Sequence, residues 1–136
     1  MLNPIDYQDP SVWMQWRQAL ADYPDVLKAI DTVEDCEGDL EDAAITLALQ
    51  ARLEPDGSPD WLRRFAKRYR SSICREFRHQ HPDLPEETYL SAIHLVRYLA
   101  AESDCPNLLI FPVALWVLSQ DLSQFCQGIE KGTPES

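Results

Sequence analysis

Basic side chains are concentrated between residues 61 and 78, and this pattern is the strongest indication of binding chemistry in the chain. Seven of the 12 Lys and Arg residues fall in this stretch. On a helical wheel of about 100° per residue they occupy one side, and large apolar residues occupy the other. We therefore predict an amphipathic helix whose apolar side faces the core. Its basic face consists of Arg63, Arg64, Lys67, Arg68, Arg70, Arg75 and Arg78.

Acidic residues dominate the stretch before this helix. Residues 22–60 hold twelve Asp and Glu residues against Lys28 and Arg52, a difference of −10, and the whole chain has a net charge of −11. The molecule should therefore be bipolar. A single-sign basic face favours docking of an acidic protein partner. Two plainer interpretations stay open: the face meets only solvent, or the acidic stretch of the same chain neutralises it.

Nucleic-acid binding through the same face is the main alternative function, because Arg-rich helices suit phosphate contacts. Two observations oppose it. The aromatic residues lie on the core-facing side of the helix, where they cannot stack on bases. The net charge of −11 also repels a phosphate backbone. We therefore predict a non-enzymatic interaction, adaptor or regulatory domain that docks an acidic partner.

A second contact surface is predicted at the first helix, which carries Trp13 and Trp16. A helix so close to the N-terminus would be only partly covered by the rest of the chain. Large aromatic residues at an exposed edge are typical interface anchors. The two indoles could thus form a homodimer seam or a partner site, and core filling is the other interpretation.

Metal-ligand spacing is weak in this chain. The acidic run 31–42 fits no EF-hand register, because each alignment misplaces a ligand or the glycine. Cys74 and His79 lack further zinc ligands at a recognised spacing. We predict no metal site and no cofactor. A loose cation cluster stays open as an alternative, formed by Asp35, Glu37, Asp39 and Glu41.

Catalytic chemistry would depend on His94, which would need Cys105 or Cys126 beside it as a nucleophile. The chain contains no Gly-rich phosphate loop, no Ser elbow and no HExxH motif. A small helical enzyme or metal-binding protein is therefore the second alternative, and no catalytic residue is predicted.

The elements that hold these residues should all be helices. The chain has only 4 glycines, few β-branched residues and no long alternation of apolar and polar positions. Helix-start signals with Pro or Asp recur along the chain, and the apolar run from Leu108 to Cys126 is typical of a buried central helix. We predict an all-α, single-domain bundle of five or six helices around this apolar C-terminal helix. The helical domain covers residues 1–127 and a flexible tail covers 128–136.

The chain begins without an export signal, and its longest apolar run is shorter than the roughly 20 residues that span a membrane. Its four cysteines, Cys36, Cys74, Cys105 and Cys126, form no Cys-x-x-Cys pair. We therefore expect reduced thiols and a cytoplasmic location.

Overall fold

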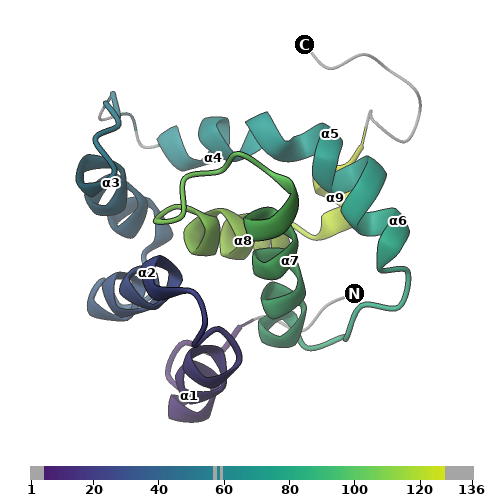
Figure 1. Cartoon of the computed structure of the whole chain (residues 1–136), viewed down its shortest axis with the longest axis horizontal. Helices are drawn as coiled ribbons and strands as arrows, with labels where there is room; N and C mark the ends of the chain where they lie inside the picture. Colours follow the sequence, from purple (N-terminus) through teal and green to yellow (C-terminus); the bar gives the residue numbers. More distant parts are fainter. Residues whose placement is uncertain (1–4, 57, 59, 128–136) are drawn as a thin grey trace.

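The computed structural model describes residues 5–56, 58 and 60–127, and these residues form helices and connections without a strand (Figure 1). The predicted all-α class is confirmed, and the predicted tail 128–136 lies outside the described residues. The helices are α1 (Pro10–Ala19), α2 (Pro24–Asp35), α3 (Leu40–Gln50), α4 (Trp61–Ala66), the 3-10 turn η1 (Lys67–Tyr69), α5 (Arg70–Ser72), the π-helix η2 (Ile73–Phe77), α6 (Arg78–Gln80), α7 (Thr88–Glu102), α8 (Ile110–Ser119) and α9 (Leu122–Phe125).

The first three helices start where the sequence predicts, α1 and α3 with a side-chain cap and α2 at Pro24 without one. The Asp9 side chain accepts a hydrogen bond from the backbone N–H of Ser11, and Pro10 takes the first helical position of α1. Asp39 caps α3 by accepting from the N–H of Asp42 at 3.1 Å. Such caps satisfy N–H groups that have no partner within the helix.

The elements from α4 to α6 follow one another without a break, and we call residues 61–80 the long helix. Its pitch tightens at η1 and widens at η2. The predicted apolar side lies in the core, with Trp61 half-buried and the remaining members fully buried. These buried members are Leu62, Phe65, Ala66, Tyr69, Ile73 and Phe77.

Helix α8 is the central apolar helix. From Ile110 to Leu118 every residue is buried except Trp116, which is partly buried. The helix contacts α2, α3, α4, α7 and α9, and Figure 1 shows it between the long helix at the top of the view and α1 at the bottom. Pro112 lies in the first turn, where its missing N–H costs no hydrogen bond. No helix within the described ranges is long and apolar enough to span a membrane.

The predicted single helix from 108 to 126 is wrong, because the chain breaks between α8 and α9 at Asp121. This residue has a φ of 65°, which a right-handed helix does not allow. Its side chain accepts from the N–H of Ser123 and so starts α9. Counting the long helix as one, the described residues form seven helices rather than five or six.

The expectation that all four thiols are reduced is also wrong. Cys74 of η2 and Cys126 at the end of α9 form a disulfide across a sequence separation of 52. Wide spacing along the chain did not keep them apart, because the fold places α9 against the long helix. Cys36 and Cys105 remain free thiols.

Candidate docking surface and pocket

The fold divides the basic face into two rows. The inner row, Arg63, Lys67, Arg70 and Arg78, faces α8 and α9. The outer row, Arg64, Arg68 and Arg75, lies further round the long helix and is exposed. The two rows have different environments, so the seven cations do not act as one uniform surface.

Ion pairs with carboxylates of the described residues occur in the first turn of the long helix. Arg63 pairs with Asp60 at 2.5 Å, and Arg64 pairs with Asp56 at 2.5 Å and with Asp60 at 3.4 Å. Hydrogen bonds from Ser58 and then Arg63 lower the pKa of Asp60 to about 2. All these side chains are about half-exposed, and such pairs add little stability.

Later turns of the basic face keep exposed cations. Lys67, Arg68 and Arg75 are exposed, and none of them has a described carboxylate within salt-bridge distance. The Arg68 guanidinium lies over the ring of Phe65, 4.9 Å from its centroid. This contact leaves the charge of Arg68 uncompensated by any carboxylate of the described residues.

The acidic side chains of α2 form their ion pairs elsewhere. Asp31 and Glu34 both pair with Arg17 of α1, at 2.8 and 2.6 Å. These two bonds raise the already high pKa of Arg17. Within the acidic stretch 22–60, Asp56 and Asp60 therefore form ion pairs with the basic face. Asp31 and Glu34 of α2 form their ion pairs with α1 instead.

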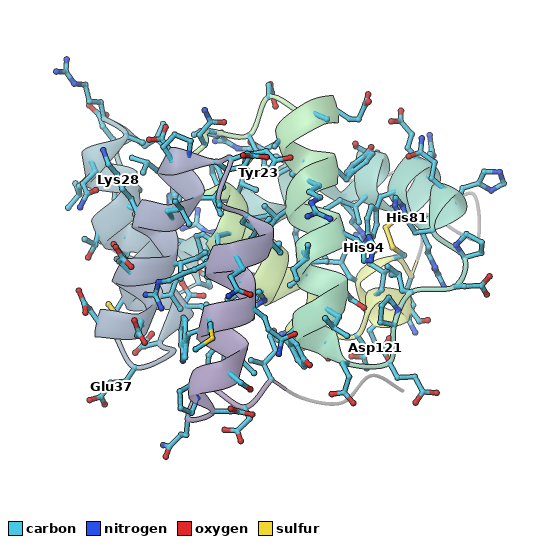
Figure 2. All side chains as sticks on the ribbon, turned by 60° about the horizontal axis from the view of Figure 1, so that its bottom comes forward. Tyr23, Lys28, Glu37, His81, His94 and Asp121 are labelled. Carbon is cyan, nitrogen blue, oxygen red and sulfur yellow. A yellow bond between two sulfur atoms is a disulfide. The ribbon has the colours of Figure 1, made fainter. Side chains whose placement is uncertain are left out.

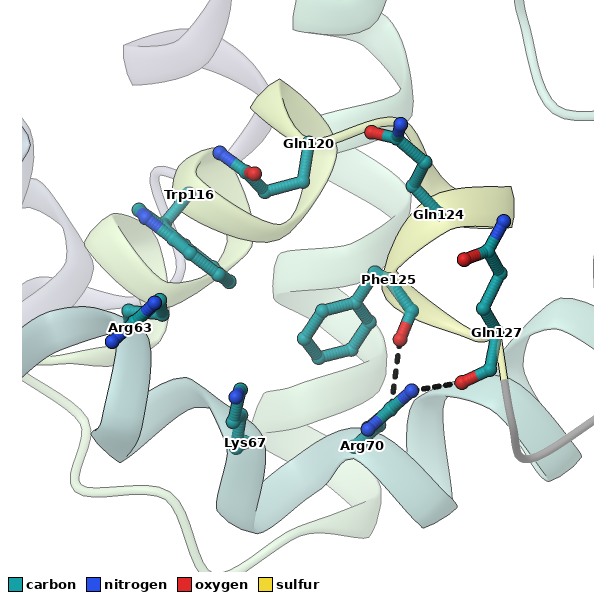
Figure 3. Close-up of a pocket in the computed structure, with 8 residues that line it drawn as sticks. All are labelled: Arg63, Lys67, Arg70, Trp116, Gln120, Gln124, Phe125 and Gln127. Atoms are coloured by element: carbon teal, nitrogen blue, oxygen red, sulfur yellow. Dashed lines mark hydrogen bonds between the residues drawn. The ribbon is translucent and has the colours of Figure 1, made fainter. Parts of the chain in front are cut away.

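Two members of the inner row hold α9 in place. Arg70 donates from Nε to the carbonyl of Phe125 at 2.8 Å and from Nη2 to the carbonyl of Gln127 (Figure 3). Arg78 donates to Oγ of Ser123 at 3.2 Å. No local sequence pattern indicates these contacts, because the partners lie 45 to 57 residues away. Arg70 and Arg78 thus have a structural role besides their charge.

An open pocket of about 320 Å³ lies between the inner row and the α8–α9 corner (Figure 3). Arg63, Lys67 and Arg70 line one wall, and no carboxylate is among the described residues that line it. The rings of Trp116 and Phe125 meet edge to face, with centroids 6.1 Å apart. The remaining lining residues are Gln120, Gln124 and Gln127.

The contact surface at Trp13 and Trp16 stays a prediction, and the structure places both indoles in the core, at 5% and 0% exposed. Trp13 donates its ring N–H to the carbonyl of Tyr7, and Trp16 donates to that of Tyr89, each at 2.9 Å. The N-terminal segment and α7 cover the helix that was expected to be open. Their burial favours the core-filling interpretation, and dimerisation stays a prediction.

The thiols on which the enzyme alternative depends are not nucleophiles in this structure. Cys126 is in the disulfide, and burial raises the pKa of the Cys105 thiol to about 12, so that it stays protonated at neutral pH. His94 packs against His81, with ring centroids 5.7 Å apart (Figure 2). Burial, the charge of His81 and that of Arg97 lower the pKa of His94.

Metal-ligand clusters of three or more His, Cys, Asp or Glu side chains do not occur within the described ranges. The disulfide occupies Cys74, the thiol of the considered zinc pair. In the acidic run, Asp39 caps α3, and Oε2 of Glu41 accepts from the backbone N–H of Leu62 at 3.3 Å. These two carboxylates have structural partners.

Comparison with known proteins adds no family to this picture. The chain matches no protein-family model, no curated protein and no solved structure. We therefore infer its function from the basic face and the pocket described above.

Proposed function

We propose that the protein is a docking module that binds an acidic segment of a partner protein through its basic face. The supporting observation is that Lys67, Arg68 and Arg75 are exposed and lack carboxylate partners among the described residues. This holds in a chain with 23 acidic and only 12 basic residues. These cations repel one another, and the acid-rich chain leaves them without carboxylate partners among the described residues. Such a surface attracts an acidic partner and disfavours basic ones.

Nucleic acid remains the competing ligand class. Phe65 and Tyr69, at 4% and 6% exposed, are turned into the core and offer no ring on which bases could stack. Trp116 is only partly buried beside the cations of the inner row, and this ring is the feature of the pocket that favours nucleic acid. An acidic protein needs no stacking platform, so it fits the face better.

The disulfide bears on where docking would take place. Structural disulfides persist in oxidising compartments and are rare in the cytosol. The Cys74–Cys126 bond therefore opposes the cytoplasmic location, which stays a prediction from the sequence.

The test compares two double variants of equal charge. Lys67→Glu/Arg75→Glu reverses two exposed cations of the basic face, and Lys28→Glu/Arg52→Glu reverses two exposed cations elsewhere. Each substitution changes the charge by −2, so both variants go from −11 to −15. Tagged wild type and both variants capture proteins from a nuclease-treated lysate, and circular dichroism confirms that all three fold.

We expect wild type and the Lys28/Arg52 variant to capture the same acidic protein, and the Lys67/Arg75 variant to lose it. The purified partner should then bind wild type directly, and binding should weaken as salt is raised. Equal capture by both variants, or capture of no protein, would contradict the proposal. Capture that occurs only in a parallel lysate without nuclease would assign the face to nucleic acid instead.

A further inference from the structure

We propose that the pocket between the inner row and the α8–α9 corner receives an aromatic side chain of the acidic partner, with acidic residues on either side of that side chain. This inference rests on the proposed docking function and specifies what the partner must contain. It combines three properties of the pocket wall: aromatic rings, cations and side-chain amides.

The aromatic rings supply the apolar part of the site. Trp116 is the one partly buried residue in the otherwise buried stretch 110–118 of α8, and it lines the pocket. Trp116 and Phe125 already meet edge to face. Phe125 is itself buried, so a third ring would contact mainly Trp116, edge to face or offset-stacked, and such aromatic pairs gain more than their buried area alone provides. The pocket volume of about 320 Å³ lies near the lower limit for ligand sites, so it suits one large side chain.

The cations select acidic neighbours for that side chain. Arg63, Lys67 and Arg70 line one wall; Arg63 also pairs with Asp60, whereas Lys67 has no carboxylate of the described residues within salt-bridge distance. The carbonyls of Phe125 and Gln127 fix the Arg70 guanidinium before any partner arrives. A charge held in place beforehand loses little conformational entropy on binding. Lys67 is exposed and can turn to meet a carboxylate on either side of the inserted ring.

The side-chain amides of the pocket favour a peptide ligand over a small aromatic anion. Gln120, Gln124 and Gln127 surround the opposite side of the pocket, as Figure 3 shows, and each amide can both donate and accept hydrogen bonds. A peptide whose side chain enters the pocket brings backbone N–H and C=O groups that need partners as water is displaced. The three amides can provide them, whereas a lone carboxylate would use only the cations.

The experiment titrates the labelled full-length protein with three short blocked peptides and follows it by two-dimensional NMR. The first peptide has a central Phe between runs of Glu, the second has Ala in place of Phe, and the third has Gln in place of every Glu. A hexathymidine oligonucleotide serves as the nucleic-acid probe. The readouts are the indole N–H of Trp116 and the backbone N–H groups of Gln120 and Gln124.

We expect the Phe–Glu peptide to shift the Trp116 indole and to bind at least about tenfold more tightly than the Ala–Glu peptide, since burying a Phe ring contributes about that factor. The Gln peptide should bind weakly or not at all. Gln124→Trp, which fills the pocket from an exposed position, should abolish the preference for Phe, and Lys67→Glu should weaken binding of both Glu-containing peptides. Arg75→Glu, on the outer row, should leave that preference intact.

The other outcomes separate this inference from the docking function. Equal binding of the Phe–Glu and Ala–Glu peptides, with shifts along the outer row, would overturn the pocket inference and leave acidic docking standing. No shift with any peptide would overturn both. A Trp116 shift at lower concentration with the oligonucleotide than with the peptide would overturn the inference in favour of nucleic acid.

Discussion

Cations of the same row on the long helix have different tasks. Arg70 donates two hydrogen bonds to carbonyls of the C-terminal segment, which requires a forked donor of fixed geometry. Lys67, three residues earlier, is exposed and carries a mobile point charge into the pocket. A helical wheel places both residues on the basic face and does not distinguish their roles. Only their surroundings show that Arg70 is part of the scaffold and that Lys67 is available to a ligand.

The thiols allow a direct test at the residue scale. Alkylation in denaturant without a reductant should modify two thiols, Cys36 and Cys105, and prior reduction should raise the number to four. In the folded protein at pH 8, Cys36 should react well before Cys105, because Cys105 is buried and its thiol has a pKa of about 12. Mass spectrometry counts the modifications. Four modifications without reductant would show that the disulfide does not form.

The identity of the surface cations was predictable from the sequence, and their partners were not. Helical periodicity placed the apolar side of the long helix in the core because burial follows from spacing alone. Asp60 lies within one turn of Arg63 and Arg64, so local spacing could have indicated those pairs. The partners of Arg70 and Arg78 depend on how the last helix packs, which spacing along the chain does not specify.

At the scale of elements, the long helix begins with a cap supplied by another helix. Its own N-cap residue, Asp60, makes no capping hydrogen bond from its side chain. Glu41 of α3 instead accepts from the N–H of Leu62 in the first turn. Glu41, which belongs to the acidic stretch 22–60, thus joins α3 to the start of the long helix. A carboxylate at a helix N-terminus also interacts favourably with the helix dipole.

Removing this cap should weaken the fold. We expect Glu41→Ala to lower the free energy of unfolding by about 1 kcal/mol, the usual effect of losing a helix cap. Urea denaturation followed by circular dichroism measures the change. Glu54→Ala, which removes an exposed carboxylate before the long helix, is the control and should change stability little. If both variants are equally stable, the Glu41 contact contributes nothing to the fold.

The starts of the first helices could be predicted from the sequence, whereas the break between α8 and α9 could not. The difference lies in whether a local signal marks the position. Pro10, Pro24 and Asp39 act on backbone groups one to three residues away, so their effect is visible in the sequence. Asp121 ends a strongly apolar run without a Gly or Pro to mark the turn. Its φ of 65° accompanies the cap to Ser123 that starts α9, and Asp is among the residues that tolerate this conformation.

For the whole molecule, net charge is a poor guide to what the basic face can bind. Electrostatic interactions between exposed charges are screened within about 8 Å at physiological salt. A partner at the long helix therefore senses the inner and outer rows far more than the distant carboxylates of α2. The net charge of −11 is compatible with an acidic ligand for this reason, and it limits binding mainly at low salt.

The disulfide should make a large contribution to the free energy of unfolding of the whole molecule. It closes a loop with a sequence separation of 52, and loop-closure entropy predicts that Cys74→Ala/Cys126→Ala lowers the free energy of unfolding by about 4 kcal/mol. Urea denaturation of both proteins without reductant measures the difference. Cys36→Ala is the control and should unfold close to wild type, because this thiol is free and only partly buried. A double variant as stable as wild type would show that packing alone holds α9.

This bond also makes a covalent ring of residues 74–126, which contains α7, the central helix α8 and the exposed connection 81–87. A protease that cuts this connection opens the ring but leaves both pieces attached through sulfur. The cleaved protein would then stay one particle of nearly unchanged mass, with its core helices still tethered to the long helix. Separation of the pieces would require a reductant as well as a protease.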